Sequence, residues 1–412
     1  MSPVRKLEAD HQVYGMMGNL RPHDIAFDPN NPACLSRSAS GDLVFRFLAP
    51  ADSEEALIVV RNGDDIAAHE MNLVGRAHDV TFWEVRVTPT TERVRFSIAV
   101  RLDDGSPIYF GITGVSGAIE RIDRFDVAVA SIPHHRVPDW ARGAVIYQIF
   151  PDRFASGDES LTPPEALPWS APPTRSGFQG GDLPGIIANL DYLEELGVDL
   201  IYLNPIFASP SNHRYDTSDY FTVDPILGGN EAFQELVEAA HRRGIRIMLD
   251  VSLNHAHPTF GPFQDLITTG PNSEYAPWFD VTEYPPHVRY RPDLVDGHHV
   301  WAERIDRLAE ATGMDVIPVS AGPVISASYD SWYGVPEMPR IDLQHPAARR
   351  FMIDVAKHWV RQYGVDAWRM DVVRYIDYDF WTDLRDAIHE VEPDTYLLAE
   401  VMGDPRRRRC WP

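Results

Sequence analysis

Carboxylate side chains stand at the ends of two predicted β-strands late in the chain, where they could act as a pair. Asp371 lies near the end of a strand predicted over residues 365–372, and Glu400 lies near the end of the next, predicted over 396–401. Cleavage of a glycosidic bond requires a carboxylate nucleophile and a carboxylic acid, and a parallel barrel delivers them from different strand ends. These two residues are therefore predicted to form such a pair.

The neighbours of the two carboxylates predict a role for each. Side chains alternate along a strand, so Arg369 shares a face with Asp371 and should lower its pKa, which keeps a nucleophile ionised. Glu400 follows Tyr396 and Leu398 on one face of an apolar strand, so its pKa should be raised, as a general acid requires. The structural alternatives are an ion pair without a catalytic role and a glutamate that merely reaches solvent.

Polar residues that follow earlier strands supply candidates for binding. Asp250 lies near the end of a strand predicted over 245–251 and could orient Arg369, while the imidazole of His255, next to Asn254, could hydrogen-bond sugar hydroxyls. Tyr215, after the second strand, offers an apolar ring face on which a pyranose can stack. Taken alone, a histidine is more often structural and a tyrosine in a turn says little, so the prediction depends on the combination.

The elements that must position these residues repeat as strand, helix, glycine and strand. Strands are predicted over 144–150, 198–203, 245–251, 365–372 and 396–401. Helices are predicted over 184–196, 231–243, 346–363 and 380–391, and the first three are closed by Gly197, Gly244 and Gly364. This repeat is typical of a parallel α/β sheet, either a barrel or a doubly wound sheet.

The strand count predicts an incomplete (β/α)8 TIM barrel over residues 140–412, because five βα units are present and eight are needed. The segment 406–412 carries neither a helix nor a strand pattern, so the chain is expected to be a truncated or frame-shifted product. Residues 256–337 interrupt the repeat and are expected to form an insertion subdomain above the catalytic face. A doubly wound nucleotide-binding sheet is disfavoured, because residues 151–156 do not resemble a Gly-x-Gly-x-x-Gly loop.

The first part of the chain has a different pattern, with short alternating strands predicted at 43–48, 56–60, 81–87 and 94–100. Turn signals at 62–63 and 104–105 separate them, which predicts an N-terminal β-sandwich over residues 1–132. A proline-containing stretch, 132–139, is predicted to link it to the next domain.

Composition mainly excludes classes of function. The formal net charge is -24, from 61 acidic and 37 basic residues, which argues against a nucleic-acid partner. Cys34 and Cys410 imply no disulfide framework. Residues 1–12 lack the apolar stretch of a secretory signal, and no apolar run reaches about 18 residues, so no membrane helix is expected. A soluble, cytoplasmic protein is expected.

Taken together, the motifs resemble the α-amylase superfamily, glycoside hydrolase family 13, and within it the cyclomaltodextrinase, neopullulanase and maltogenic amylase group. They lie at residues 147–154, 180–183, 212–217, 250–255, 338–342, 364–371 and 397–401. The resemblance covers residues from about 10 to 405. It implies retaining hydrolysis of α-1,4-glucosidic bonds in maltodextrins, cyclodextrins or pullulan, with cleavage of α-1,6 bonds and transglycosylation as further activities.

The resemblance also implies roles and partners. Asp371 is then the nucleophile, Glu400 the general acid/base and Arg369 the residue that holds the nucleophile. The binding residues would be Asp250, Asn254 and His255 of the first shared region, and His213 and Tyr215 at the subsite of the attacked sugar. An α-glucan oligosaccharide is the expected partner. The N-terminal strands resemble the group's starch-binding-type domain, which often takes part in dimerisation, so a homodimer through that domain is expected.

The chain departs from the group's pattern at several points. The third essential acid of the family lies in a His-Asp pair beyond the fifth strand, where this chain has ended, so the alternative is a catalytically inactive, carbohydrate-binding fragment. Residues 340–342 are Arg-Ile-Asp where relatives usually have Lys-Leu-Asn, and 372–375 differ from the usual acidic pattern. Linkage preference and the acceptor side are therefore left open.

The resemblance requires no cofactor, but some relatives bind calcium near the first barrel strand. Asp158, Gly180 and Asp182 match that site, whereas Ser156, Leu161 and Thr162 stand where better oxygen ligands are usual. Calcium takes six to eight oxygen ligands, so the match is only partial.

Overall fold

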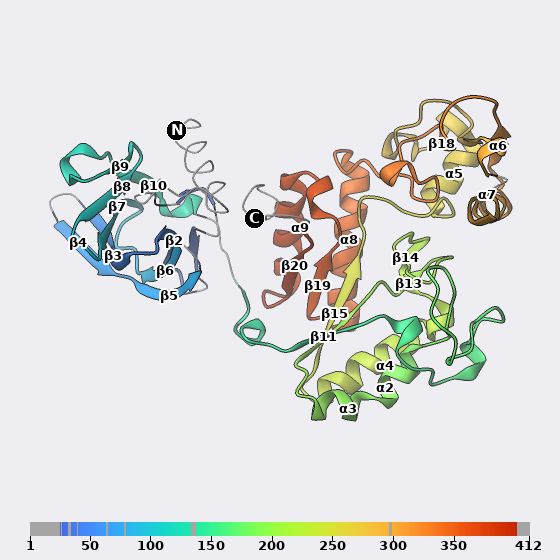
Figure 1. The fold of residues 1–412 in the computed structure, drawn as a ribbon, viewed down its shortest axis with the longest axis horizontal. Coiled ribbons are helices and arrows are strands. Elements are labelled where there is room, and N and C mark those ends of the chain that lie inside the picture. The colour runs from blue at the N-terminus through green and yellow to red at the C-terminus, as the bar shows by residue number, and fades with distance from the viewer. Residues whose placement is uncertain are drawn as a thin grey trace. The chain divides into compact units, whose positions relative to one another are not determined.

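The computed structural model describes residues 25, 27–31, 34–38, 40–62, 65–77, 80–132, 137–295 and 299–401 (Figure 1). These residues form two compact units, one ending at Val137 and the other beginning at Pro138. Several predictions lie outside the described residues, namely those for residues 1–12, Gly63, residues 133–136 of the linker, and 406–412 with Cys410. No described helix has both the length and the apolar character needed to cross a membrane.

The N-terminal unit contains two antiparallel sheets, in the orders β1-β2-β6-β5 and β4-β3-β7-β8-β9, with β10 paired to β7. Their strands are β1 (Leu35–Arg37), β2 (Leu43–Pro50), β3 (Ser53–Asn62), β4 (Asp65–Glu70), β5 (Asn72–Ala77), β6 (Val80–Val87), β7 (Arg93–Leu102), β8 (Pro107–Gly111), β9 (Gly114–Ser116) and β10 (Phe125–Ala128). Short 3-10 helices are η1 (Ile119–Arg121) and η2 (Val129–Ser131).

Alternating apolar residues build the core of this unit. Phe96 and Ile98 of β7 are buried while Arg95 is exposed, as a strand with one face on a core requires. The rings of Phe45 on β2 and Phe96 on β7 meet edge to face, with centroids 4.9 Å apart. The two sheets therefore share one apolar cluster. The predicted sheet-rich character of the region is confirmed.

The second unit is built on a five-stranded parallel sheet in the order β11-β12-β15-β19-β20, so neighbouring strands follow chain order. These strands are β11 (Ile146–Ile149), β12 (Leu200–Leu203), β15 (Arg246–Val251), β19 (Ala367–Met370) and β20 (Tyr396–Ala399). The helices before the insertion and after it are α2 (Leu183–Ala188), α3 (Leu190–Glu195), α4 (Gly229–Arg242), α8 (Pro346–Tyr363) and α9 (Tyr378–Val391). The mixed α/β content is confirmed, and closure into a barrel stays a prediction.

Shorter elements complete this unit outside the insertion. A two-stranded sheet pairs β13 (Phe207–Ala208) with β14 (Asp219–Val223). The 3-10 helices are η3 (Asp139–Ala141), η4 (Pro151–Arg153), η5 (Glu159–Leu161), η6 (Pro225–Leu227) and η10 (Val373–Tyr375).

One predicted helix is interrupted in the structure, whereas the three glycines predicted to end helices have the conformation that this role requires. The helix predicted over 184–196 is two helices, because Asn189 leaves the helical conformation and its side-chain amide donates 2.8 Å to the carbonyl of Gly185. The predicted helix-closing glycines all have positive φ, +79° at Gly197, +75° at Gly244 and +69° at Gly364. Such left-handed residues commonly end helices, and glycine adopts them without strain.

Residues 256–337 contain more regular structure than the sequence indicated. They form α5 (Gly261–Thr269), α6 (Pro292–Val295), α7 (His299–Thr312), β16 (His287–Tyr290), β17 (Asp315–Pro318) and β18 (Ile325–Ala327), with η7 (Gly270–Asn272), η8 (Ala276–Trp278) and η9 (Trp332–Gly334). The strands form a sheet in the order β17-β16-β18. These strands have three or four residues, which is too short for an alternating pattern to stand out.

The parallel sheet has two apolar faces. On one, Leu200, Tyr202, Met248 and Ala367 form a buried cluster. On the other, Phe207 packs between Trp368 of β19 and Trp359 of α8, with ring centroids 6.4 and 5.1 Å away. Figure 1 shows α8 and α9 beside β19 and β20. The face that carries Leu200 and Met248 bears charged side chains toward the carboxyl ends of its strands.

Candidate active site

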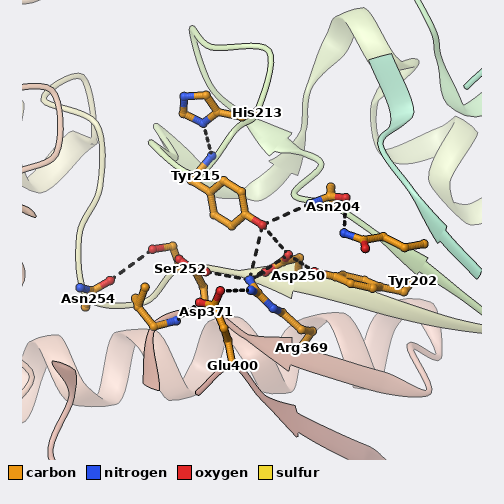
Figure 2. A network of polar contacts seen from close by, with 12 residues as sticks. Tyr202, Asn204, His213, Tyr215, Asp250, Ser252, Asn254, Arg369, Asp371 and Glu400 are labelled. Atoms are coloured by element: carbon orange, nitrogen blue, oxygen red, sulfur yellow. Dashed lines mark hydrogen bonds and ion pairs between the residues drawn. The ribbon is translucent and has the colours of Figure 1, made fainter. Parts of the chain in front are cut away.

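Arg369 joins three carboxylates at the carboxyl end of the parallel sheet (Figure 2). Its Nη1 lies 2.7 Å from Oδ1 of Asp371 and 2.8 Å from Oδ1 of Asp250, and its Nη2 lies 2.8 Å from Oε1 of Glu400. Strand register explains the meeting, since Asp250 pairs with Arg369 across β15 and β19, and Leu398 of β20 pairs with Arg369 from the other side. Glu400, two residues after Leu398, extends the same face.

Asp250 is almost fully buried, with 1% of its surface exposed. Its Oδ2 accepts hydrogen bonds from the hydroxyls of Tyr202, at 2.5 Å, and Tyr215, at 2.8 Å. Burial raises the pKa of Asp250, although Arg369 and the two hydroxyls oppose the rise. A buried charge is costly unless it is paired and hydrogen-bonded, and these three donors meet that need.

The predicted pKa of Asp371 is wrong in direction. Burial and the charge of Asp250 raise the pKa of Asp371 to about 8, against the opposing effect of Arg369. The guanidinium does lower the pKa of Asp371, but burial and the charge of Asp250, which shares the same Nη1, outweigh it.

The predicted pKa of Glu400 is also wrong in direction. Burial raises it, but hydrogen bonds from the backbone N–H of Val372, at 3.0 Å, from Asp371 and from Arg369 together bring the pKa of Glu400 below its usual value. The apolar neighbours are outweighed by these donors. Because the two carboxyl groups are hydrogen-bonded to each other, they titrate as a pair that shares one proton.

The backbone after Asp371 turns sharply. Val372 has φ +46° and ψ 37°, in the left-handed region, which is rare for a β-branched residue and costs on the order of 1–3 kcal/mol. This turn ends β19 two residues before the predicted strand end. It also accompanies the hydrogen bond from Val372 to Glu400, so the strained residue contacts one of the paired carboxyls.

His213 and Tyr215 flank Arg214, which pins their loop. Arg214 is fully buried, has φ +58°, and forms a 2.7 Å ion pair with Asp224. Tyr215 points its hydroxyl at Asp250, while its backbone N–H lies 3.2 Å from Nδ1 of His213. Figure 2 shows His213 at the outer end of this arrangement. Burial lowers the pKa of His213, which favours a neutral imidazole.

Asn254 and His255 lie in the loop after β15. The Nδ1 of His255 is 2.8 Å from Oδ1 of Asn254, and Ser252 lies within hydrogen-bond distance of both. Burial lowers the pKa of His255 to about 4, so the ring is neutral at physiological pH. The ring stacks on Trp332, with centroids 5.6 Å apart and an interplanar angle of 14°.

An aromatic cluster and a cleft adjoin these residues. Trp332 meets Tyr375 edge to face at 4.5 Å, and the hydroxyls of Tyr333 and Tyr375 are in contact. Tyr333 is 71% exposed. Tyr375 and Asn254 also line a cleft of about 450 Å³ with Phe279, Asp280, Asp330, Arg340, Ile341, Asp342, Leu343, Gln344, Ile376 and Asp377.

Comparison with known proteins assigns the chain to a family. The family described as Alpha amylase, catalytic domain, matches residues 148–411. The chain belongs to the alpha-amylase family.

Relatives within the alpha-amylase family extend the match. A cyclomaltodextrinase of Geobacillus thermopakistaniensis (strain MAS1) is 38% identical over 78% of this chain and 50% of its own length. An intracellular maltogenic amylase of Bacillus subtilis (strain 168) is 36% identical over 82% and 50%, and neopullulanase 2 of Thermoactinomyces vulgaris is 36% identical over 78% and 50%. The chain thus spans about half the length of these curated relatives.

Solved structures of the alpha-amylase family agree. A cyclomaltodextrinase superimposes with a TM-score of 0.71 at 28% identity, covering 92% of this chain and 60% of that one. A maltogenic amylase from S. marinus gives a TM-score of 0.68 at 29% identity, covering 94% and 54%.

The sequence reasoning missed residues that support the Arg369 cluster in this alpha-amylase family chain. Tyr202 bonds Asp250, Asn204 donates 3.2 Å to the Tyr215 hydroxyl, and Gln148 donates 2.9 Å to Asn204. Tyr202 lies on the inward face of β12, and Asn204, two residues later, continues that alternation. The polar side chains of Tyr202 and Asn204 on this inward face could have identified them as site residues from the sequence.

The residues that match the family's calcium site are engaged otherwise. Both oxygens of buried Asp182 accept backbone N–H groups, from Gly157 at 2.8 Å, Gly185 at 2.6 Å and Asp158 at 2.9 Å. Asp158 accepts from Ser160. As placed, these acceptors face donors and do not fit a cation, and the part of the chain that the structure describes holds no cluster of three or more His, Cys, Asp or Glu suited to a metal. Calcium binding through Asp158, Gly180 and Asp182 stays a prediction.

Proposed function

We propose that this chain belongs to a retaining glycoside hydrolase that cleaves α-1,4-glucosidic bonds of maltodextrins, cyclodextrins or pullulan. The observation that carries the proposal is the bridge that Arg369 forms between Asp371 and Glu400, which holds both carboxyls at one point of the sheet edge. The names of the relatives, which include cyclomaltodextrinase and neopullulanase, support the substrate class.

In the proposed first step, a carboxylate oxygen of Asp371 attacks the anomeric carbon while the bond to the leaving oxygen breaks. Glu400 gives its proton to that oxygen, and a covalent glycosyl-enzyme results. Glu400 then takes a proton from water, whose oxygen displaces Asp371 and releases the sugar. The single proton shared by the pair is the one consumed, so it must reside on Glu400 when the leaving oxygen departs.

The closeness of the two carboxyls favours retention over inversion. Inverting enzymes separate their carboxyls by about 6.5–9.5 Å to admit a water molecule, whereas retaining enzymes hold them closer, at about 5–5.5 Å. In this structure Asp371 and Glu400 hydrogen-bond each other and share Arg369. Two carboxyls held this closely by one guanidinium fit the shorter separation of a retaining enzyme and support a double displacement.

The aromatic residues suit sugar binding on both sides of the scissile bond. The Tyr215 ring beside Asp250 would stack on the attacked sugar, with His213 next to it. Trp332 and Tyr375 would contact the leaving sugar or an incoming one. A second sugar that replaces water in the deglycosylation step would give transglycosylation, and α-1,6 bonds would be a second linkage.

The remaining expectations about the whole protein are part of the same proposal. An α-glucan oligosaccharide is the proposed partner, and a homodimer would form through the N-terminal unit. The Bacillus subtilis relative is named an intracellular maltogenic amylase, which supports a cytoplasmic location.

The test is glucan cleavage by the purified 412-residue chain on maltotriose, a cyclodextrin and pullulan, followed by proton NMR of the first sugar released. Retention predicts that the α-anomer appears first. Asp371→Asn should lower the rate on the order of a thousand-fold or more. Asp366→Asn is the matched control, because Asp366 precedes the same strand at its opposite end and bonds His241, and it should keep activity.

Two results would overturn the proposal. One is release of the β-anomer first, and the other is cleavage that survives Asp371→Asn. Absence of sugar release from all three substrates would also overturn it for this chain.

A further inference from the structure

The phenol of Tyr202 lies in the site, but the proposed reaction steps assign it no role. Its ring is buried on the inward face of β12, among Leu200, Met248 and Ala367. A phenylalanine would pack there equally well. The hydroxyl instead ends 2.5 Å from Oδ2 of Asp250, the shortest of the side-chain hydrogen bonds that this carboxylate accepts.

The surroundings of Asp250 show why that hydroxyl matters. The groups that face its carboxylate are Tyr202 of β12, Tyr215 of the following loop, Arg369 of β19, and the like charge of Asp371. Arg369 is shared with Asp371 and Glu400, and the Tyr215 hydroxyl also accepts from Asn204. Tyr202 supplies the shortest of the hydrogen bonds to Asp250, beside the larger charge effect of the shared Arg369.

We propose that Tyr202 is a positioning residue of the site, whose hydroxyl fixes the Asp250 carboxylate so that Arg369 is held between Asp371 and Glu400. The inference rests on the proposed function for its effect on the reaction. Without the hydroxyl, one lone pair of a buried carboxylate loses its donor. Arg369 is then the remaining strong donor and is drawn toward Asp250, away from the two carboxyls that it bridges.

The first readout is the pH dependence of thermal stability, which needs no activity. Tyr202→Phe removes only the hydroxyl and should raise the pKa of Asp250 further. The folded state then holds a proton to higher pH than the unfolded state, so stability falls more steeply as pH rises. The melting temperature of the variant should trail that of the wild type by a margin that widens as pH rises above the ordinary aspartate pKa of 3.8.

Tyr329→Phe is the matched control. Tyr329 is equally buried, but its hydroxyl donates to a backbone carbonyl, that of Pro336, at 2.7 Å. Losing this hydrogen bond should lower the melting temperature by the same amount at every pH, because its acceptor is a backbone carbonyl that does not titrate.

The second readout is maltotriose cleavage. Tyr202→Phe should lower kcat about 10- to 100-fold, the usual effect of losing a supporting hydrogen bond behind a reacting group, and change KM less than about threefold. Tyr329→Phe should change neither.

The inference is overturned if Tyr202→Phe shows the pH-independent loss of the control, or if its pH dependence changes while kcat does not. If the wild-type chain cleaves no glucan, the proposed function fails. The melting curves then still decide whether Tyr202 anchors Asp250.

Discussion

At the residue scale, burial and a like charge set the protonation of Asp371, whereas hydrogen-bond donors set that of Glu400. Glu400 follows apolar residues along β20, yet Val372 and Arg369 stabilise its charge. Asp371 is next to an arginine, yet burial and Asp250 favour its proton. The shared proton therefore resides on Asp371, and sugar binding must transfer it to Glu400 before the first step.

This arrangement predicts that Asp371→Asn stabilises the protein at high pH. The pKa of Asp371 is about 8 when folded, against a model-peptide value of 3.8. The folded state thus binds an extra proton between those values, and its stability falls as pH rises through that window. Asparagine removes the penalty, so calorimetry should find the variant's melting temperature above that of the wild type at pH 9, with the difference vanishing near pH 4.

Glu400→Gln is the control for that prediction. The pKa of Glu400 lies below its usual 4.5, so its charge contributes stability above that pH, and the contribution is lost as pH falls through the lowered pKa. Glutamine should therefore lower the melting temperature at neutral pH. A destabilised Asp371→Asn variant at pH 9 would contradict the assignment of the raised pKa.

At the element scale, the loop between β13 and β14 depends on one buried ion pair, that of Arg214 and Asp224. The two side chains are 1% and 7% exposed, and Asp224 also caps η6. Removing one partner of such a pair leaves an uncompensated buried charge and typically costs about 3–5 kcal/mol. Arg214→Met should lower the free energy of unfolding, measured by urea denaturation, by about that amount.

Arg101→Met serves as the reference for this change. Arg101 pairs with Glu55 at 2.8 Å, their side chains are 50% and 38% exposed, and exposed pairs contribute little to the free energy of unfolding. Equal losses for the two variants would show that the Arg214 pair does not anchor the loop.

The elements that could be predicted from the sequence are those with strong local signals. Gly364 predicted the end of α8, and the apolar run at 245–251 predicted β15. The strands of the insertion were missed because they have three or four residues. The end of β19 was missed because it depends on the left-handed turn at Val372. Valine rarely adopts this conformation, so the sequence gives no indication of it.

The sequence predicted which residues meet in the candidate site better than it predicted the directions of their pKa shifts. Asp250, Arg369, Asp371 and Glu400 meet as strand alternation indicated, because residues that end neighbouring parallel strands share one sheet edge. The pKa directions could not be predicted, since they depend on the depth of burial and on donors from other elements. Tyr202 was missed for the same reason.

At the scale of the whole molecule, the N-terminal unit has its own core. Its buried residues form one cluster drawn from both of its sheets, and the chain divides after Val137. A unit with a self-contained core commonly folds alone.

We therefore expect residues 1–137, expressed alone, to show a β-type circular dichroism spectrum and one cooperative thermal transition. The second measurement is the melting of the 412-residue chain, in which a transition at the same temperature should recur. A gradual, non-cooperative loss of signal in the isolated unit would contradict this expectation.

Because one guanidinium meets three carboxylates, the site also selects ligands by their charge. Arg369 offsets only one of the charges of Asp250, Asp371 and Glu400, which leaves the cluster at -2, or at -1 while the pair holds its proton. Neutral glucans meet no charge penalty there. A phosphorylated sugar is repelled, whereas a sugar mimic with a basic ring nitrogen enters as a cation and gains attraction in proportion to the burial of the site.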